Sequence, residues 1–171
     1  AQAGPRDDRA WDVLPTWIWD GAADESERNR AILIRGERIE AVLPADDVAV
    51  TSLPAHLRFE FPGCTAIPGL IDAHVHTTAA MGPAFLAAGV TTIRDTGNDL
   101  QWILNLRAAH AANPAQGPQI ICCGNLLDGS PANWPIGMGR AHVDEAALRQ
   151  SVREHAAAGV EQIKLYARLD A

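Results

Sequence analysis

The sequence lacks any uninterrupted apolar stretch of about 20 residues, the length that crosses a membrane. It also lacks clusters of lysine and arginine, and its formal net charge is -7. Nucleic acids and anionic membrane surfaces attract basic patches, so an acidic chain argues against both as partners. We therefore expect no transmembrane helix, no nucleic-acid partner and no membrane partner. The hydrophobic share of 47% is sufficient for a globular core.

Cysteine is scarce and badly spaced for metal binding or cross-linking. The three cysteines are Cys64, Cys122 and Cys123, and none belongs to a CxxC pair or a Cys/His cluster. Adjacent residues of a strand point to opposite faces, so Cys122 and Cys123 are poorly placed to bridge each other. This pattern argues against a zinc knuckle and predicts three buried cysteines that act as small hydrophobic residues.

The first part of the chain predicts a small unit of β-strands. Residues 1–11 predict a flexible tail, and their small first residues suit the product of signal-peptide cleavage. Such cleavage favours a periplasmic or secreted protein, with a cytoplasmic one as the alternative. In residues 12–64, the string AILIRGERIEAVLP predicts a hairpin that turns at Gly36. The alternating LRFEF at residues 57–61 predicts a further strand, and no helical periodicity is visible.

Residues 65–171 show alternating strand and helix patterns. Strands are predicted in IDAHVHT, VTTIRDTG, PQIICCGNLL and VEQIKLYARL, with helices in AAMGPAFLAAG, LQWILNLRAAHAAN and VDEAALRQSVREHAAAG. This alternation implies parallel strands joined by helical crossovers. The sequence therefore predicts an α/β fold, either half of an eight-stranded barrel or a small doubly wound sheet.

Two histidines stand two residues apart in the first of these strands. Side chains alternate across a strand, so His74 and His76 project from the same face. Neighbouring imidazoles on a strand are good zinc ligands, and a catalytic zinc keeps a position open for water. The pair lies at the carboxyl end of its strand, where barrel enzymes place their sites, and Asp72 on the same face could orient a histidine. A chance His-x-His motif is the alternative.

The fourth predicted strand contains a lysine. If Ile163 and Leu165 pack outward against helices, Lys164 points inward. Burying an unpaired ammonium group is unfavourable, whereas a neutral lysine amine can act as a base or combine with carbon dioxide to form a carbamate. A lysine that extends to the barrel rim is the alternative. Tyr166 shares the face of Lys164 and could bind a substrate carbonyl or carboxylate, or could be a half-buried aromatic with a wet hydroxyl.

The strings PGLIDAHVHT, GVTTIRDTG and GVEQIKLYA together resemble the amidohydrolase superfamily, in its imidazolonepropionase-like and prolidase-like branch. The resemblance covers residues 19–169. It implies that residues 65–171 are the first half, four strands, of a metal-dependent hydrolase with a (β/α)8 TIM barrel. Residues 12–64 would be the N-terminal part of a small β-sandwich domain.

The resemblance also implies a metal site. His74 and His76 would bind a divalent metal, and Lys164 would be carboxylated and bridge two metal ions. Zinc suits these donors, with manganese, cobalt or iron as alternatives. The implied activity is hydrolysis of an amide or peptide-like C–N bond by a metal-activated hydroxide, and the enzyme could be dipeptidase-like. Lys164 and Tyr166 are the candidate catalytic residues.

The family's other ligands have no counterpart within these 171 residues. They are histidines of the fifth and sixth strands and an aspartate of the eighth strand, which also transfers protons. The resemblance therefore implies a complementary C-terminal half that supplies them, and a small amide or peptide-like substrate. We expect the complete enzyme to be a homo-oligomer.

Other residues are weaker candidates. Arg94 and Asp95 end the second strand, and since only one can face inward, we expect a structural role. The Gly/Pro-rich residues 126–142 predict a long loop at the rim, in which Trp134 and Met138 could line a substrate pocket or merely fill the loop. The remaining histidines are expected at structural or surface positions: His56, His110, His142 and His155.

Two other functions compete with hydrolysis. A non-catalytic half-barrel would bind metal or a complementary chain through its open strand edges. A doubly wound nucleotide-binding domain would need a glycine-rich loop after its first strand, but TTAAMGPAF contains neither GxGxxG nor GK[ST]. The joint presence of His74, His76 and Lys164 favours the hydrolase.

Overall fold

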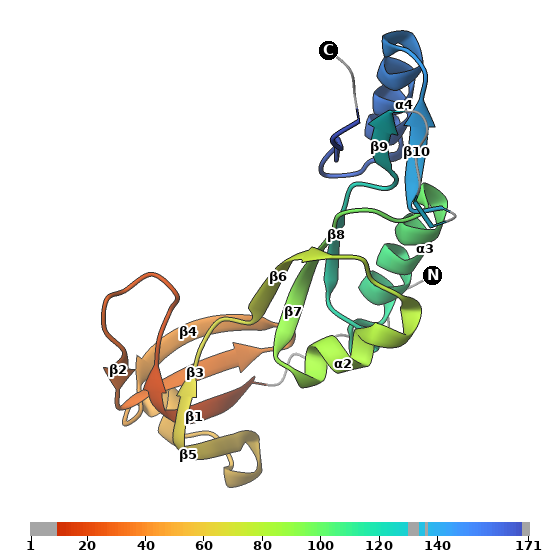
Figure 1. The fold of residues 1–171 in the computed structure, drawn as a ribbon. Helices are drawn as coiled ribbons and strands as arrows, with labels where there is room; N and C mark the ends of the chain where they lie inside the picture. The colour runs from red at the N-terminus through yellow and green to blue at the C-terminus, as the bar shows by residue number, and fades with distance from the viewer. Residues whose placement is uncertain (1–9, 130–133, 136, 169–171) are drawn as a thin grey trace. The chain divides into compact units, whose positions relative to one another are not determined.

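The computed structural model describes residues 10–129, 134–135 and 137–168, which form two compact units that divide after Pro68 (Figure 1). Of the expected flexible tail, residues 1–9 lie outside the described residues. Ala10 and Trp11 were wrongly assigned to that tail, because they already belong to strand β1 (Ala10–Ile18) and pair with β3. Within the described part of the chain, no helix is both long and apolar enough to cross a membrane.

The first unit is built on a five-stranded sheet around β1. This strand pairs antiparallel with β2 (Glu27–Arg28) and β3 (Arg30–Arg35), and parallel with β5 (Arg58–Ala66). The predicted hairpin is confirmed, since β3 turns back into β4 (Arg38–Pro44).

Two expectations for this unit were wrong, namely that it contains only strands and that Cys64 is buried. A one-turn helix α1 (Val48–Thr51) and a 3-10 turn η1 (Ala55–Leu57) separate β4 from β5. One turn is too short to show a helical period, so only the Asp47 side chain, which accepts a hydrogen bond from the Ala49 N–H, could have signalled it. Cys64 is exposed rather than buried, because β5 is exposed along most of its length.

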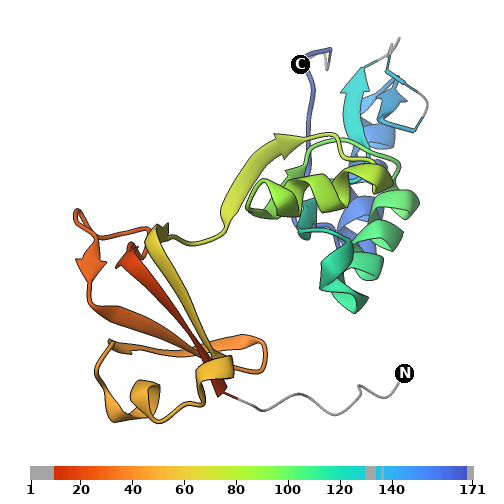
Figure 2. The same ribbon diagram turned by 90° about the horizontal axis from the view of Figure 1, so that it is seen from below.

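The second unit begins with a parallel sheet of β6 (Leu70–Val75), β7 (Val90–Asp95) and β8 (Gln119–Cys122), in that order. The connecting helices are α2 (Gly82–Ala87), after the 3-10 turn η2 (Ala79–Met81), and α3 (Leu100–Ala112), before the 3-10 turn η3 (Pro114–Gln116). Figures 1 and 2 show both helices on the same side of the sheet. They cover it with a core of Val75, Ile93, Ile103, Ile120 and Cys122.

Beyond β8 the chain departs from the predicted pattern. The expected loop at residues 126–142 begins and ends in strands, β9 (Leu126–Gly129) and β10 (Gly139–His142), which pair with each other in parallel. Residues 130–133 and 136 of that loop lie outside the described residues. The predicted helix is confirmed as α4 (Glu145–Ala158), with Gly159 at its end as expected, whereas Asp144, expected in the first turn, caps the helix instead.

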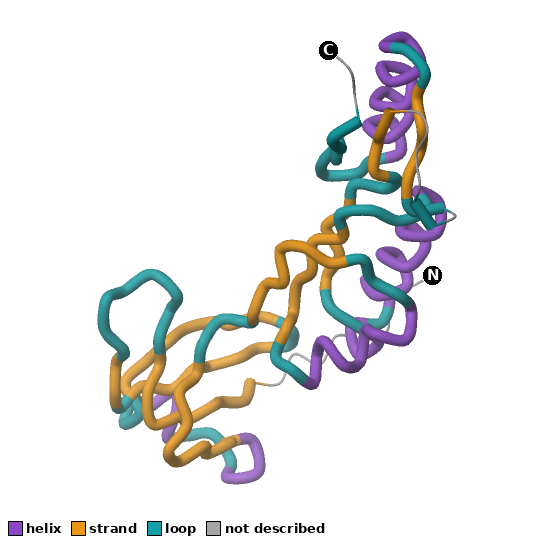
Figure 3. Tube along the Cα trace, viewed as in Figure 1, coloured by secondary structure: helices purple, strands orange, loops and turns teal. Residues whose placement is uncertain are grey.

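The fourth strand expected over residues 160–169 is not formed in the described part of this segment, which Figure 3 draws as loop. Its one strand-like contact is a parallel bridge between Leu165 and Leu127. The reason lies in the residues that directly follow β8. After β8, the Cys123 N–H donates to the Asp95 carbonyl and the Gly124 carbonyl accepts from the Asn98 N–H, so residues 123 and 124 follow the loop after β7 and interrupt the edge that a fourth strand would need.

Candidate functional site

The two histidines of the predicted metal site lie side by side. Val75, between them in the sequence, is buried in the core under the helices, whereas His74 and His76 are exposed. Their ring centroids are 5.7 Å apart, with an angle of 71° between the ring planes. The alternation expected from the sequence is therefore observed, although β6 ends at Val75 and His76 is the next residue.

A backbone carbonyl fixes the ring of His76. Its Nδ1 lies 2.9 Å from the Gly97 carbonyl oxygen. Because a carbonyl only accepts, Nδ1 carries the proton in this contact, and Nε2 of the neutral ring is left with the lone pair that a metal needs. The backbone of Gly97 approaches the ring closely, since a Cβ here would lie 3.1 Å from His76 Cε1 and the ring would have to shift to make room for it.

The loops on both sides of this contact are held by Asp95, the last residue of β7. Its buried carboxylate accepts hydrogen bonds from the Thr77 N–H at 2.8 Å, the Gly97 N–H at 3.1 Å and the Asn98 amide at 2.7 Å. Asp95 thus connects the segments after β6 and β7, which agrees with the structural role expected for it. Sequence reasoning missed Gly97 and Asn98; the signal was the turn-forming string Asp-Thr-Gly-Asn, which begins at the last residue of the strand.

Arg94 and Asp72 also lie near the histidine pair. Arg94 is exposed on the face opposite Asp95, and its Nε donates to the Ala73 carbonyl at 2.6 Å. Asp72 accepts a hydrogen bond from the backbone N–H of His74 at 3.3 Å, so in this structure it holds the main chain rather than an imidazole. The pairing of β6 with β7 is irregular between Asp72 and Val75, and such irregularities re-aim side chains near functional sites.

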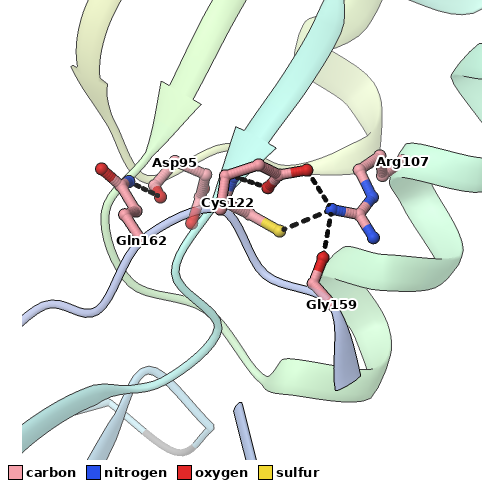
Figure 4. A network of polar contacts seen from close by, with 6 residues as sticks. Asp95, Arg107, Cys122, Gly159 and Gln162 are labelled. Atoms are coloured by element: carbon pink, nitrogen blue, oxygen red, sulfur yellow. Dashed lines mark hydrogen bonds and ion pairs between the residues drawn. The ribbon is translucent and has the colours of Figure 1, made fainter. Parts of the chain in front are cut away.

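The segment that carries Lys164 is attached to the ends of β7 and β8 (Figure 4). The Glu161 carboxylate accepts from the Cys122 N–H at 3.0 Å, and the Glu161 N–H donates to the Cys122 carbonyl at 3.2 Å. The same carboxylate forms an ion pair with Arg107 of α3. Gln162 donates to the Asp95 carbonyl at 3.2 Å. Side-chain contacts thus replace part of the missing strand pairing.

Lys164 is half-buried and its main chain is fixed by β9. The Leu127 N–H donates to the Lys164 carbonyl at 2.8 Å, and the Tyr166 N–H donates to the Leu127 carbonyl at 2.9 Å. Burial raises the pKa of the Cys123 thiol to about 12, while the charge of Lys164 acts in the opposite direction. Leu165 is 54% exposed, so it does not meet the condition, packing outward against helices, on which the inward direction of Lys164 was predicted.

The remaining candidates lie beyond these strand ends. Tyr166 is 41% exposed and contacts Trp134, and Met138 is half-buried. His142, expected on the surface, is buried in β10 and hydrogen-bonds the Asp128 carbonyl and the Ser151 hydroxyl. Buried positions also hold His110 and His155, whereas His56 is exposed.

The donor atoms of the two histidines are of a type that binds a divalent metal, but two of them are fewer than a protein metal site needs. Two neutral imidazoles suit zinc and its neighbours in the transition series. Across the described residues, however, no group of three or more His, Cys, Asp or Glu side chains gathers closely enough to hold an ion. The histidine pair can therefore supply part of a coordination sphere.

Comparisons with known proteins agree on the fold. No protein-family model matches the sequence, and no curated protein does so significantly. Among solved structures, a candidate prolidase from Bifidobacterium longum has a TM-score of 0.74 and 28% identity, with 95% of this chain and 42% of that chain covered.

Two further structures are similar over the same part. A prolidase complexed with N-methylphosphonate-L-proline has a TM-score of 0.73 and 22% identity, over 92% of this chain and 46% of that chain. Molinate hydrolase has a TM-score of 0.75 and 20% identity, over 93% of this chain and 45% of that chain. This chain spans less than half the length of each. The mixed α/β fold and the family resemblance predicted from the sequence are thereby confirmed: over nearly its whole length, the chain is similar to the N-terminal part of solved structures named as prolidases and as an amidohydrolase.

Proposed function

We propose that this chain supplies the first half of the active site of a metal-dependent hydrolase that cleaves an amide or peptide-like C–N bond. The observation that carries the proposal is the His74–His76 pair, with ring centroids 5.7 Å apart and His76 Nδ1 held by the Gly97 carbonyl. Metal-binding histidines in proteins are oriented by such a contact to their second nitrogen. Names of similar structures support the class, since they include prolidases and molinate hydrolase.

In this proposal, His74 and His76 would hold a divalent metal, zinc by preference, and Lys164, as a carbamate, would contribute to a site with a second ion. A bound metal would polarise the substrate carbonyl and lower the pKa of water. Asp95 and Gly97 hold His76, and Glu161 and Gln162 hold the segment of Lys164. Tyr166 contacts the substrate.

The rest of the site would come from a complementary C-terminal half. That half would complete a (β/α)8 barrel on the open side of β6–β8 and a β-sandwich on the first unit. The similar structures support this arrangement, because the chain covers only 42–46% of their length. We also expect the completed enzyme to form homo-oligomers.

Metal titration tests the histidine pair directly. Co²⁺ added to the metal-free protein should produce visible absorption bands. His74→Gln and His76→Gln should each weaken Co²⁺ binding by more than about 100-fold, because loss of a residue that merely orients a ligand already costs about 10–100-fold. His56→Gln is the matched control, since His56 is exposed and lies in the other unit. Equal Co²⁺ affinity in all three variants would show that the pair is not the metal site.

Activity is tested on the protein assembled with its complementary half. A panel of N-acyl amino acids, dipeptides and simple amides should show metal-dependent hydrolysis that His74→Gln abolishes and His56→Gln preserves. Metal-independent turnover, equal in both variants, would contradict the mechanism.

A non-catalytic half-barrel remains the second candidate. One observation favours it, which is that the described residues bring no third His, Cys, Asp or Glu to the histidine pair. It predicts that the complementary half assembles with this chain in metal-free buffer and that no amide in the panel is hydrolysed.

A further inference from the structure

Next to the bridge between Leu127 and Leu165, the buried carboxylate of Asp128 holds together the loop that contains Trp134 and the segment that follows Lys164. Asp128 of β9 is fully buried, yet its oxygens accept hydrogen bonds from the Gly129 N–H at 2.9 Å, the Arg168 N–H at 3.0 Å and the Trp134 indole N–H at 2.9 Å. Burial acts to raise the pKa of Asp128, but these donors outweigh it and the pKa is lowered. Asp128 is therefore a fixed anchor for the indole.

Trp134 is held on two other sides. Its ring lies edge-on to Tyr166, with centroids 4.5 Å apart and an angle of 89° between the planes. It also lies over Gly139 of β10, where a Cβ would be 2.5 Å from Trp134 Cδ1. An indole fixed by an anion, by a glycine and by a second ring has little freedom to move.

The aromatic pair lies on the Lys164 side of its segment. Leu165 bridges to Leu127, and side chains alternate along such an extended stretch, so Tyr166 and Lys164 share the opposite side. Tyr166 is 41% exposed and Trp134 half-buried, so the pair presents aromatic surface. The carboxylate of Asp128 is fully buried, so it is not itself part of that surface.

We propose that Trp134 and Tyr166 form an apolar wall of the substrate site, and that Asp128 and Gly139 are the positioning residues that hold it. The wall selects amides that carry an uncharged ring or similarly flat apolar group beside the scissile bond. Such groups stack on aromatic side chains, whereas small polar amides gain little there. This inference rests on the proposed function, because it takes the ligand of the wall to be the substrate.

The single tyrosine of this chain provides a specific probe. With 3-fluorotyrosine incorporated, Tyr166 should give one ¹⁹F resonance. Millimolar benzamide should shift this resonance saturably, and acetamide at the same concentration should leave it in place. Gly139→Ala and Trp134→Phe should each move the resonance without ligand and weaken benzamide binding by about three- to tenfold, the range expected for loss of one aromatic contact. Trp102→Phe is the matched control, because Trp102 is exposed on α3.

The outcomes separate this inference from the proposed function, since the ¹⁹F measurement needs no metal. An unshifted resonance with benzamide, or an equal shift with acetamide, overturns the aromatic wall. If Co²⁺ binds the histidines but benzamide has no effect, the wall alone is wrong. If benzamide shifts the resonance but Co²⁺ does not bind, the proposed function fails; the aromatic wall then still binds rings, but it is not the wall of a hydrolase substrate site. Circular dichroism shows whether Gly139→Ala and Trp134→Phe are folded. If one of them is not, the other variant alone tests the aromatic wall.

Discussion

Replacing Asp95 by alanine should both destabilise the protein and weaken its metal binding. The carboxylate accepts three hydrogen bonds, and two of the donors, the backbone N–H groups of Thr77 and Gly97, belong to buried residues. A buried donor left without a partner costs about 1–3 kcal/mol, whereas the half-buried Asn98 amide can turn to water. We therefore expect the free energy of unfolding to fall by about 4 kcal/mol, a large part of the typical 5–15 kcal/mol.

The control for this prediction is Asp99→Ala, four residues further along. Asp99 is exposed and caps α3 by accepting a hydrogen bond from the Trp102 N–H at 2.9 Å. Loss of such a cap costs about 1 kcal/mol. Urea unfolding followed by circular dichroism measures both variants, and Co²⁺ titration shows whether Asp95→Ala also weakens metal binding through Gly97 and His76. If the two variants lose equal stability, Asp95 does not hold these loops.

Two further predictions concern buried titratable groups. Burial lowers the pKa of His155 from its ordinary 6.5, so the unfolded chain binds the proton more readily, and stability should decline as the pH falls below about 6.5. Urea midpoints between pH 8 and pH 5 should therefore fall more steeply in the wild type than in His155→Leu; parallel curves would contradict this. Burial also raises the pKa values of Cys122 and Cys123 to about 11 and 12, whereas Cys64 is exposed. A thiol reagent at pH 8 should accordingly label Cys64 at once and the other two only in denaturant, and rapid labelling of all three would contradict the burial.

The histidine pair was predictable because its geometry is local. Two residues separated by one always share a face of a strand, and the apolar Val75 indicated which face is buried. The contact that fixes His76 was not predictable in the same way, because the Gly97 carbonyl lies 21 residues away in the sequence. It depends on where β7 ends and how Asp95 closes the loop.

The segment around Lys164 shows a different limit. Its apolar alternation predicted a strand, yet a strand needs a neighbour along its whole length. That neighbour is interrupted between Cys122, where β8 ends, and Leu126, where β9 begins, so Leu165 forms one bridge only. The contact between Asp128 and Trp134 could not be predicted from the sequence either, because it joins a short strand to a loop whose composition carries no periodic signal.

The attachment of Glu161 to Cys122 has a consequence for how this protein can change length during evolution or engineering. Lys164 follows three residues after that attachment, and no continuous ladder absorbs a slip. Inserting or deleting one residue in this interval would shift the amine by about 3.3 Å and turn it to the opposite side. The number of residues between Glu161 and Lys164 therefore cannot change without displacing Lys164, whereas exposed turns such as residues 21–25 of the first unit can accept insertions.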